Sequence, residues 1–265
     1  MKTSSTPSGA RDRATSPIST RAPHRRRAAR GFTLVEALIS MTIVGMAMGG
    51  AMSIFVMGLK IMYRDTERLA TNASLRYFIA QMSKETLDST EFYVFPNYQA
   101  LDASVNLTSD VSTLQSDSYG TQLAYGDCVV LVSRVDTDDA TSNVRQFRIY
   151  YRVATDTSVR APIRYYESQD FGATGSGSPL TTLLNAVNLR TTPTITGSRQ
   201  IVGSTRGRLQ AGSNPAYYYP IFATETDADT PTNYSVSVNV EVINGTATNN
   251  LLSSSSFNYT ISPRK

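Results

Sequence analysis

The chain has almost no histidine or cysteine. Among its 265 residues there is one of each, and there is no tryptophan. The single histidine, His24, lies in a basic N-terminal tail, so the rest of the chain has no histidine for a catalytic triad, a general base or a metal ligand. The single cysteine, Cys128, cannot form an intramolecular disulfide. These absences exclude many enzyme classes but leave carboxylate chemistry open. We expect a protein that is not an enzyme and that has no cofactor.

The basic excess of the chain is confined to its first residues. The whole chain has 25 Lys and Arg against 21 Asp and Glu, but residues 1–31 contain eight basic residues and one acid. The remainder therefore holds 17 basic and 20 acidic side chains and is mildly acidic. A nucleic-acid-binding protein needs a basic folded surface, so we expect no nucleic-acid partner. The tail is rich in Ser, Thr, Pro and Ala, which predicts disorder.

A long apolar segment follows the tail. Residues 32–59 contain one charged side chain, Glu36, and the segment exceeds the roughly 20 residues that a helix needs to cross a bilayer. The preceding arginines place the N-terminus in the cytoplasm by the positive-inside rule. Residues 60–90 lack Pro and Gly, and we expect one helix over roughly 32–90 whose second half carries one apolar stripe. The stripe residues are Met62, Leu69, Ala73, Leu75, Phe78, Ile79, Met82 and Leu87.

The chain from about residue 92 has the pattern of β structure. Three of the expected strands, 144–153, 234–243 and 256–262, alternate apolar and polar residues, which predicts one buried and one wet face. A long loop is expected at 97–122. The expected strands are 128–134, 144–153, 163–167, 194–202, 216–222, 234–243 and 256–262. An antiparallel sheet packed against the amphipathic half of the long helix gives an α+β fold.

Glu36 is difficult to explain in a simple membrane anchor or a cleaved secretory signal. A carboxylate at the middle of a membrane costs about 2.5–3.5 kcal/mol, and less near the interface. Charges in membrane segments usually have partners, and this segment has no basic residue before Lys60. Cleavage between Gly31 and Phe32 would create a cationic α-amine four residues from Glu36. The amine and the carboxylate of neighbouring identical helices could then neutralise each other.

The segment RRRAARGFTLVEALISM, residues 25–41, resembles the N-terminal signal of the type IV pilin and type II secretion pseudopilin superfamily. That signal is a basic leader ending in Gly, followed by Phe, a mostly apolar stretch and Glu, which match Gly31, Phe32 and Glu36. The resemblance implies that a prepilin peptidase cuts after Gly31 and N-methylates Phe32. It also implies that Glu36 guides assembly by pairing with the amine of a neighbour, and that the helices form a filament core.

The resemblance further implies an organisation for the chain. Residues 1–31 are a cleaved leader, 32–59 the membrane-spanning half of the helix, 60–91 its amphipathic half and 92–265 a β-rich extracytoplasmic domain. The implied location is the bacterial inner membrane, with this domain in the periplasm or in an extracellular filament. The implied partners are the prepilin peptidase, other pilins or pseudopilins, an inner-membrane assembly platform and the lipid bilayer. The domain size resembles PilW-like and GspJ-like minor subunits.

The expected helix departs from that of many major pilins. It has no proline, and the chain lacks a C-terminal cysteine pair. It carries Gly45, Gly49, Gly50 and Gly58 instead, and each lowers helix propensity by up to about 1 kcal/mol relative to Ala. The spacing of Gly45 and Gly49 permits close helix approach. A packing role and a role as a flexible point are both open.

Other groups give weaker signals. Asp136, Asp138 and Asp139 are weak Ca²⁺ candidates, because oxygen-rich loops can hold this ion, but a solvated loop between two strands explains them more simply. Asp227 and Asp229 form a second segment of this kind.

Three sets of residues are expected to be structural. The tyrosines are expected in sheet packing, the arginines on a wet strand face and the cysteine in the core: Tyr217, Tyr218 and Tyr219; Arg145, Arg148 and Arg152; Cys128. Two alternatives to a filament subunit stay open. One is a membrane-tethered β domain that binds an extracytoplasmic ligand without polymerising, and the other is a tethered enzyme, which the missing histidine disfavours.

Overall fold

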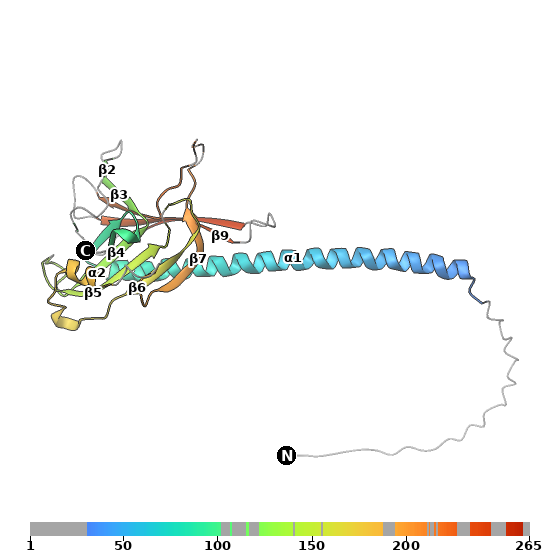
Figure 1. The fold of residues 1–265 in the computed structure, drawn as a ribbon, viewed down its shortest axis with the longest axis horizontal. Helices are drawn as coiled ribbons and strands as arrows, with labels where there is room; N and C mark the ends of the chain where they lie inside the picture. Colours follow the sequence, from blue (N-terminus) through green and yellow to red (C-terminus); the bar gives the residue numbers. More distant parts are fainter. Residues whose placement is uncertain are drawn as a thin grey trace, which may run out of the picture. The chain divides into compact units, whose positions relative to one another are not determined.

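The fold is taken from a computed structural model (Figure 1). It describes residues 31–101, 107, 115–116, 122–139, 141–154, 156–187, 194–210, 212, 215, 217–226, 234–244 and 253–261. The predicted disorder of the tail therefore lies outside the described residues. The chain divides into two compact units, residues 1–55 and 56–265.

One long helix begins in the first unit and ends in the second. The helix predicted at roughly 32–90 is confirmed as α1, Leu34–Leu87. It is long and apolar enough to cross a membrane, judged by length and composition. Two hydroxyls satisfy carbonyl groups near its C-terminal end: Ser89 Oγ donates to the Glu85 carbonyl at 2.6 Å, and Ser133 Oγ donates to the Asp88 carbonyl at 2.9 Å.

The described strands form one antiparallel sheet, and an α+β fold with a long N-terminal helix is confirmed. The order in the sheet is β1-β4-β5-β6-β7-β9-β8-β3-β2, with β10 paired to β9. The strands are β1 (Glu91–Phe95), β2 (Gln115–Ser116), β3 (Gln122–Gly126), β4 (Cys128–Arg134), β5 (Val144–Arg152), β6 (Ala161–Glu167), β7 (Arg199–Gly207), β8 (Phe222–Thr226), β9 (Tyr234–Asn244) and β10 (Ser253–Ile261). The short helices are η1 (Tyr98–Leu101), η2 (Gly172–Thr174) and α2 (Leu180–Ala186).

Several boundaries differ from the predicted ones. The expected loop at 97–122 contains η1 and β2, and α2 was not predicted. The strand expected at 194–202 is observed as β7, five residues later at each end. The strand expected at 216–222 is observed as β8, which starts only after Pro220, a residue without an N–H group for a sheet ladder.

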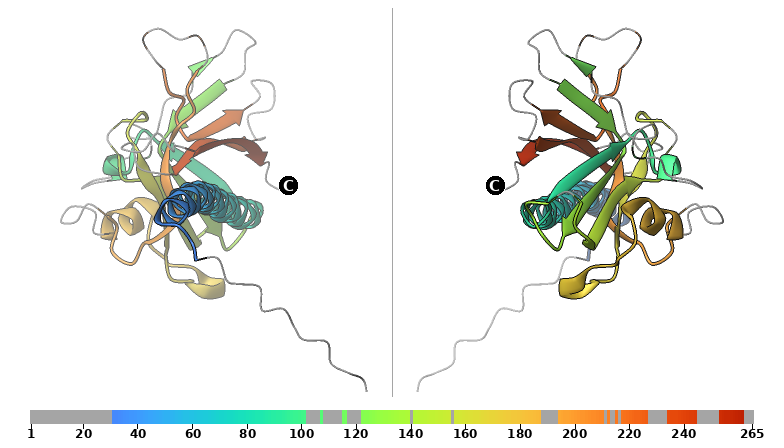
Figure 2. Two further views of the ribbon diagram at one scale, coloured as in Figure 1. Left: turned by 90° about the vertical axis from the view of Figure 1, so that its right-hand side faces the viewer. Right: turned by 90° about the vertical axis from the view of Figure 1, so that its left-hand side faces the viewer.

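Both faces of the central strands are buried. On one face, Leu75, Phe78 and Met82 of α1 pack in a cluster that includes Tyr150 of β5 and Val238 of β9. On the other face, α2 and η1 cover β4 and β5. The residues of this second cluster include Tyr98, Leu101, Val130, Ile149, Tyr151, Leu180 and Leu184. Figure 2 gives two further views of these elements.

The alternation predicted for residues 234–243 is confirmed in β9, where Val236, Val238, Val240 and Val242 are buried. The alternation predicted for β5 was wrong. Its expected wet face carries Arg148, whose side chain is only 13% exposed, and Arg152, which is fully buried. Arg145 is exposed, as expected for a wet face. The alternation failed here because charged residues on a strand buried on both faces are matched by carboxylates from other elements.

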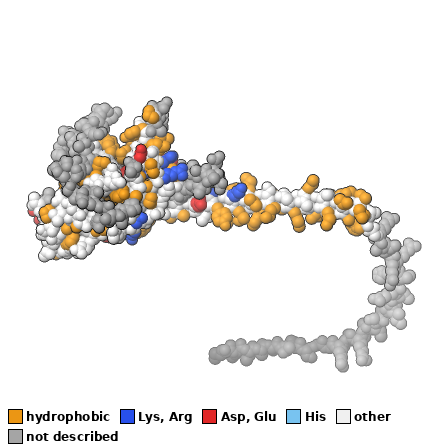
Figure 3. All heavy atoms as spheres, viewed as in Figure 1, with side chains coloured by type: hydrophobic (Ala, Val, Ile, Leu, Met, Phe, Trp, Pro, Cys, Tyr) orange, Lys and Arg blue, Asp and Glu red, His pale blue; other side chains and the backbone are white. Residues whose placement is uncertain are grey.

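The second half of α1 has two apolar stripes, not the single stripe predicted. Leu75, Phe78 and Met82 are buried against the sheet. Met62, Leu69 and Leu87 are exposed, with 70% exposure for Leu69, and they lie on the opposite side of the helix by the 100° turn per residue. Large apolar side chains are visible along α1 in Figure 3. The described chain therefore leaves one of the two stripes uncovered.

The two ends of the sheet approach each other at Gly126. A Cβ atom on Gly126 would lie 1.9 Å from the Phe95 carbonyl oxygen, so only glycine fits between β3 and β1. The next residue, Asp127, donates its N–H to the Pro96 carbonyl at 3.0 Å. The sheet is therefore curled, with its first strand beside its second-to-last one.

Candidate functional site

The candidate processing segment directly precedes α1. Gly31, Phe32 and Thr33 are exposed and have no regular secondary structure. The Thr33 carbonyl accepts the first helical hydrogen bond from Ala37 N–H at 3.1 Å, and Thr33 Oγ1 accepts a hydrogen bond from Glu36 N–H at 3.3 Å. Thr33 is therefore the N-cap of α1. The sequence reading missed it, although the Thr-x-x-Glu spacing of a capping box was present.

Glu36 lies in the first turn of α1 and is exposed. Its carboxylate is close to the positive end of the helix dipole, which favours an acid there. Within the described residues no basic side chain forms an ion pair with Glu36. The described part of the chain thus stabilises this carboxylate through the helix terminus and supplies it with no counter-ion.

The four glycines of α1, Gly45, Gly49, Gly50 and Gly58, face open space. A methyl group added at Gly45, Gly49 or Gly50 would have no atom within 4 Å. Packing inside the described chain therefore does not require glycine at these positions. Both roles considered for them, helix packing and a flexible point, remain predictions.

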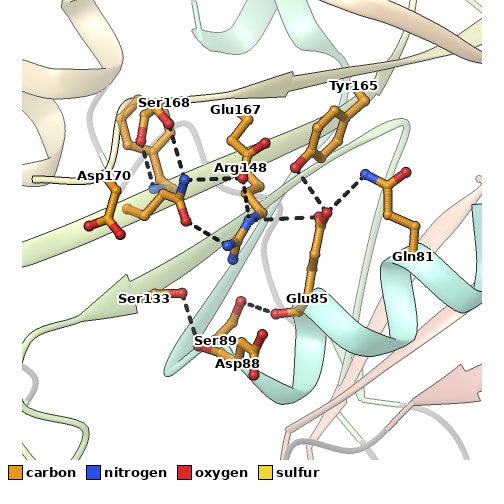
Figure 4. Close-up of polar contacts among 12 residues, drawn as sticks. Gln81, Glu85, Asp88, Ser89, Ser133, Arg148, Tyr165, Glu167, Ser168 and Asp170 are labelled. Carbon is orange, nitrogen blue, oxygen red and sulfur yellow. Dashed lines mark hydrogen bonds and ion pairs between the residues drawn. The ribbon is translucent and has the colours of Figure 1, made fainter. Parts of the chain in front are cut away.

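A buried polar cluster joins the end of α1 to β5 and β6 (Figure 4). Glu85 accepts hydrogen bonds from Tyr150 Oη at 2.6 Å, Tyr165 Oη at 2.9 Å and Gln81 Nε2 at 2.9 Å. Arg148 Nε lies 3.9 Å from Glu85 Oε2. The sequence reading missed this cluster, because Glu85 looks like any other charged residue on an amphipathic helix.

The environment of the cluster fixes the protonation of its tyrosines. Burial, followed by the neighbouring Glu85 carboxylate, raises the pKa of Tyr150 and of Tyr165 far above the ordinary value. Both phenols therefore stay neutral and act as donors. The acceptor oxygens of Glu85 are already engaged by three donors, so the arrangement suits the holding of α1 on the sheet rather than proton transfer to a substrate.

A second buried ion pair holds loops at the other end of β5. Arg152 Nη2 lies 2.7 Å from Asp127 Oδ2, and Arg152 also donates to backbone carbonyls. The carbonyl acceptors are Asp156 at 2.6 Å, Val159 at 2.6 Å, Thr205 at 3.2 Å and Thr157 at 3.4 Å. Asp127 Oδ1 accepts the Ile221 N–H at 3.2 Å. The ion pair thus connects its own strand β5 to three further segments through Arg152 and to Ile221 through Asp127.

The carboxylates of the acidic loop between β4 and β5 hydrogen-bond within the loop. Asp136 Oδ1 accepts the Asp138 N–H at 3.0 Å, and Asp139 Oδ1 accepts the N–H and hydroxyl of Thr141. The carboxylates of Asp136 and Asp139 thus stabilise the turns in which they lie. The described part of the chain holds no group of three His, Cys, Asp or Glu that could bind a metal. Asp227 and Asp229 lie outside the described residues.

The cysteine and the tyrosines that were expected to be structural differ in their burial. Cys128 is fully buried, as expected for a core residue, and burial raises the pKa of its thiol. Tyr218 forms an isolated bridge with Leu209, and Arg206 stacks over its ring at 5.2 Å. Tyr217 is half exposed, so the prediction that all three tyrosines pack in the sheet was wrong for this residue.

Comparison with known proteins finds one match. Residues 26–52 match the family model described as "Prokaryotic N-terminal methylation motif". No curated protein and no solved structure matches the chain. The matched range includes Gly31, Phe32, Thr33 and Glu36 and the first turns of α1. The chain thus carries a prepilin-type N-terminal methylation motif at the head of a long apolar helix, which supports a type IV pilin-like protein.

Proposed function

We propose that the chain is a pilin-like structural subunit of a type IV pilus or a type II secretion pseudopilus. A prepilin peptidase cleaves it between Gly31 and Phe32 and methylates the new amine of Phe32. The observation that carries this proposal is the methylation motif at residues 26–52, which coincides with an exposed, non-helical Gly31–Phe32 segment directly before α1.

The proposed organisation follows the motif. Residues 1–31 are the leader, 32–59 cross the bacterial inner membrane, 60–91 continue the helix and 92–265 form an extracytoplasmic domain. The N-terminus is cytoplasmic before cleavage. The size of the domain favours a minor subunit, PilW-like or GspJ-like, over an abundant major one.

The uncovered surface of α1 supports a role in assembly. The candidate membrane-spanning window has no buried residue in the described chain. The second half adds the exposed stripe of Met62, Leu69 and Leu87. Apolar surface of this extent marks contacts with lipid or protein. Lipid suits the first half, and neighbouring helices of a filament suit both.

Glu36 has a proposed partner only after cleavage and only in another subunit. The α-amine of Phe32 is cationic both before and after methylation, and in a bundle of parallel helices it lies at a depth similar to that of Glu36. Pairing would remove most of the desolvation cost of both charges, because unpaired charges in a membrane are expensive. Gly45 and Gly49 would allow neighbouring helices to approach closely.

The test is mass spectrometry of the mature protein, produced together with a prepilin peptidase. We expect an N-methylated N-terminus at Phe32. Gly31→Ala should stay an unprocessed precursor that is heavier by the leader. An intact N-terminus in the wild type would contradict the proposal. Correct processing without any filament would favour the tethered, ligand-binding domain instead.

A further inference from the structure

We propose that Thr33 is a positioning residue for cleavage of the Gly31–Phe32 bond, because its N-cap fixes the start of α1 and leaves this bond outside the helix. The inference rests on the proposed function. Thr33 would act on the substrate's own conformation and need not touch the peptidase. The cleavage itself adds water across the Gly31 C–N Phe32 bond and leaves a carboxylate on Gly31 and an amine on Phe32.

The first step of the argument is where the helix begins. α1 starts at Leu34, and Thr33 supplies both elements of an N-cap: its carbonyl accepts from Ala37 N–H at 3.1 Å and its hydroxyl from Glu36 N–H at 3.3 Å. An N-cap residue has non-helical backbone. The two residues before it, Gly31 and Phe32, are outside the helix, and Phe32 is 75% exposed.

The second step is what the helix would do without the cap. Ala28, Ala29 and Arg30 are among the best helix formers, so intrinsic propensity favours extension of α1 toward the N-terminus. A helix that ran through Gly31 and Phe32 would engage the backbone around the scissile bond in i→i−4 hydrogen bonds. Gly31 opposes this extension by up to about 1 kcal/mol, which is similar to the contribution of an N-cap. The hydroxyl of Thr33 is the side-chain group that fixes the boundary on the far side of the bond.

The third step turns this boundary into an effect on cleavage. A peptidase must reach the carbonyl carbon of Gly31, and it therefore binds the form in which this backbone is free. When only a fraction of the substrate is competent, the apparent affinity falls by that fraction. Loss of an N-cap costs ~1 kcal/mol, which changes the equilibrium constant between the capped and the extended helix by about fivefold. The change should enter KM and leave kcat unaltered, because the bound substrate is the same.

A competing explanation is direct reading of residue 33 by the peptidase. The two explanations rank the same substitutions differently. Thr33→Val keeps the branched shape but has no acceptor, whereas Thr33→Asn changes the shape but is a good N-cap. Thr33→Ser keeps the hydroxyl and serves as the conservative control.

The experiment measures cleavage of the full-length chain in detergent or vesicles by a purified prepilin peptidase. We expect Thr33→Val to raise the apparent KM by up to about fivefold with kcat unchanged. Thr33→Ser and Thr33→Asn should stay within about twofold of the wild type, since both restore a cap. Hydrogen exchange of the full-length chain should show a slower Phe32 amide in Thr33→Val than in the wild type.

Two results would overturn the inference while leaving the proposed function intact. One is cleavage of Thr33→Val with wild-type KM. The other is a Thr33→Asn substrate as poor as Thr33→Val, which would point to recognition of the side chain itself. A wild-type chain that the peptidase does not cleave would overturn the proposed function and this inference together.

Discussion

Arg152 and Asp127 form an ion pair in which Nη2 and Oδ2 are 2.7 Å apart and neither side chain is more than 4% exposed. Such a pair is difficult to form, because both ions lose their hydration, and it is held here by excellent hydrogen bonding of the guanidinium. The pair stabilises the domain because of where its two residues lie. The two residues join the start of β4, the loop after β5, strand β7 and the residue before β8.

Removal of Arg152 should destabilise the domain strongly. Arg152→Ala leaves Asp127 buried without a counter-ion, and breaking a buried pair in this way costs about 3–5 kcal/mol. Urea unfolding followed by near-UV circular dichroism of the tyrosines measures the loss. The matched control is Arg145→Ala, which breaks the exposed pair with Asp170 and should cost less than about 1 kcal/mol. Equal losses in the two variants would contradict the assigned role.

The loss of stability on replacing Glu85 should depend on which residue replaces it. Glu85→Ala removes the acceptor of Tyr150 and Tyr165 and leaves their buried hydroxyls unsatisfied, so the free energy of unfolding should fall by about 3 kcal/mol. Glu85→Gln keeps one acceptor oxygen and should lose less.

The control for Glu85 is Glu167→Ala. Glu167 also contacts Arg148 but its side chain is 43% exposed, and its loss should stay below about 1 kcal/mol. The same unfolding measurement serves all three variants. If Glu85→Ala proved as stable as Glu167→Ala, the cluster would not be holding α1 on the sheet.

The buried tyrosines predict a loss of stability at alkaline pH. Burial and Glu91 raise the pKa of Tyr93 to about 12, and burial with Glu85 raises the pKa of Tyr150 and Tyr165 further. Unfolded tyrosine titrates near pH 10. A group whose native pKa is the higher one contributes its full stability below its unfolded pKa and loses it as the pH rises toward the native pKa.

The free energy of unfolding should therefore be insensitive to these tyrosines up to about pH 10 and should fall steadily above it. Urea titrations between pH 8 and pH 12 measure this curve. Tyr93→Phe removes one of the three groups and should make the decline between pH 10 and pH 12 shallower. A wild-type curve that is flat to pH 12 would refute the prediction.

Glu36 should be dispensable for cleavage and required for assembly. Glu36→Gln keeps a capping-box residue three positions after Thr33, so α1 should still begin at the same place. Processing should match the wild type, while incorporation into filaments should fail because the carboxylate is gone. Ser40→Ala, which removes only a hydroxyl bonded to the Glu36 carbonyl, is the control and should assemble. Filament-associated protein measured by immunoblot distinguishes the two, and normal assembly of Glu36→Gln would contradict the role.

The strongest periodic signals in the sequence were reliable. The long helix followed from an apolar run and a segment without Pro or Gly, and β9 followed from four valines at alternate positions. The core position of Cys128 followed from its apolar neighbours. In these elements the burial of each residue depends on its own segment, so the local pattern of apolar residues predicts it.

The failures occurred where distant residues decide the environment. Arg148 and Arg152 are buried because Glu85 and Asp127, far away in sequence, meet them. The sequence predicted one apolar stripe on α1 instead of two. Leu69 and Leu75 are the same residue type, and only their surroundings in the fold distinguish them. Thr33 was overlooked for another reason: its hydroxyl acts on the adjacent backbone and leaves no mark on hydrophobic periodicity.

The buried face of α1 also sets an order of events during synthesis. Glu85 meets Tyr165, which lies 80 residues later, and Ser83 meets the hydroxyl of Tyr259, which lies 176 residues later. Leu75, Phe78 and Met82 therefore leave the ribosome, and in the proposed topology cross the membrane, long before the strands that cover them. Non-local pairing of this kind is intrinsically slow. The nascent subunit must hold its helix in the bilayer and keep Leu75, Phe78 and Met82 apart from other chains until its last strand has arrived.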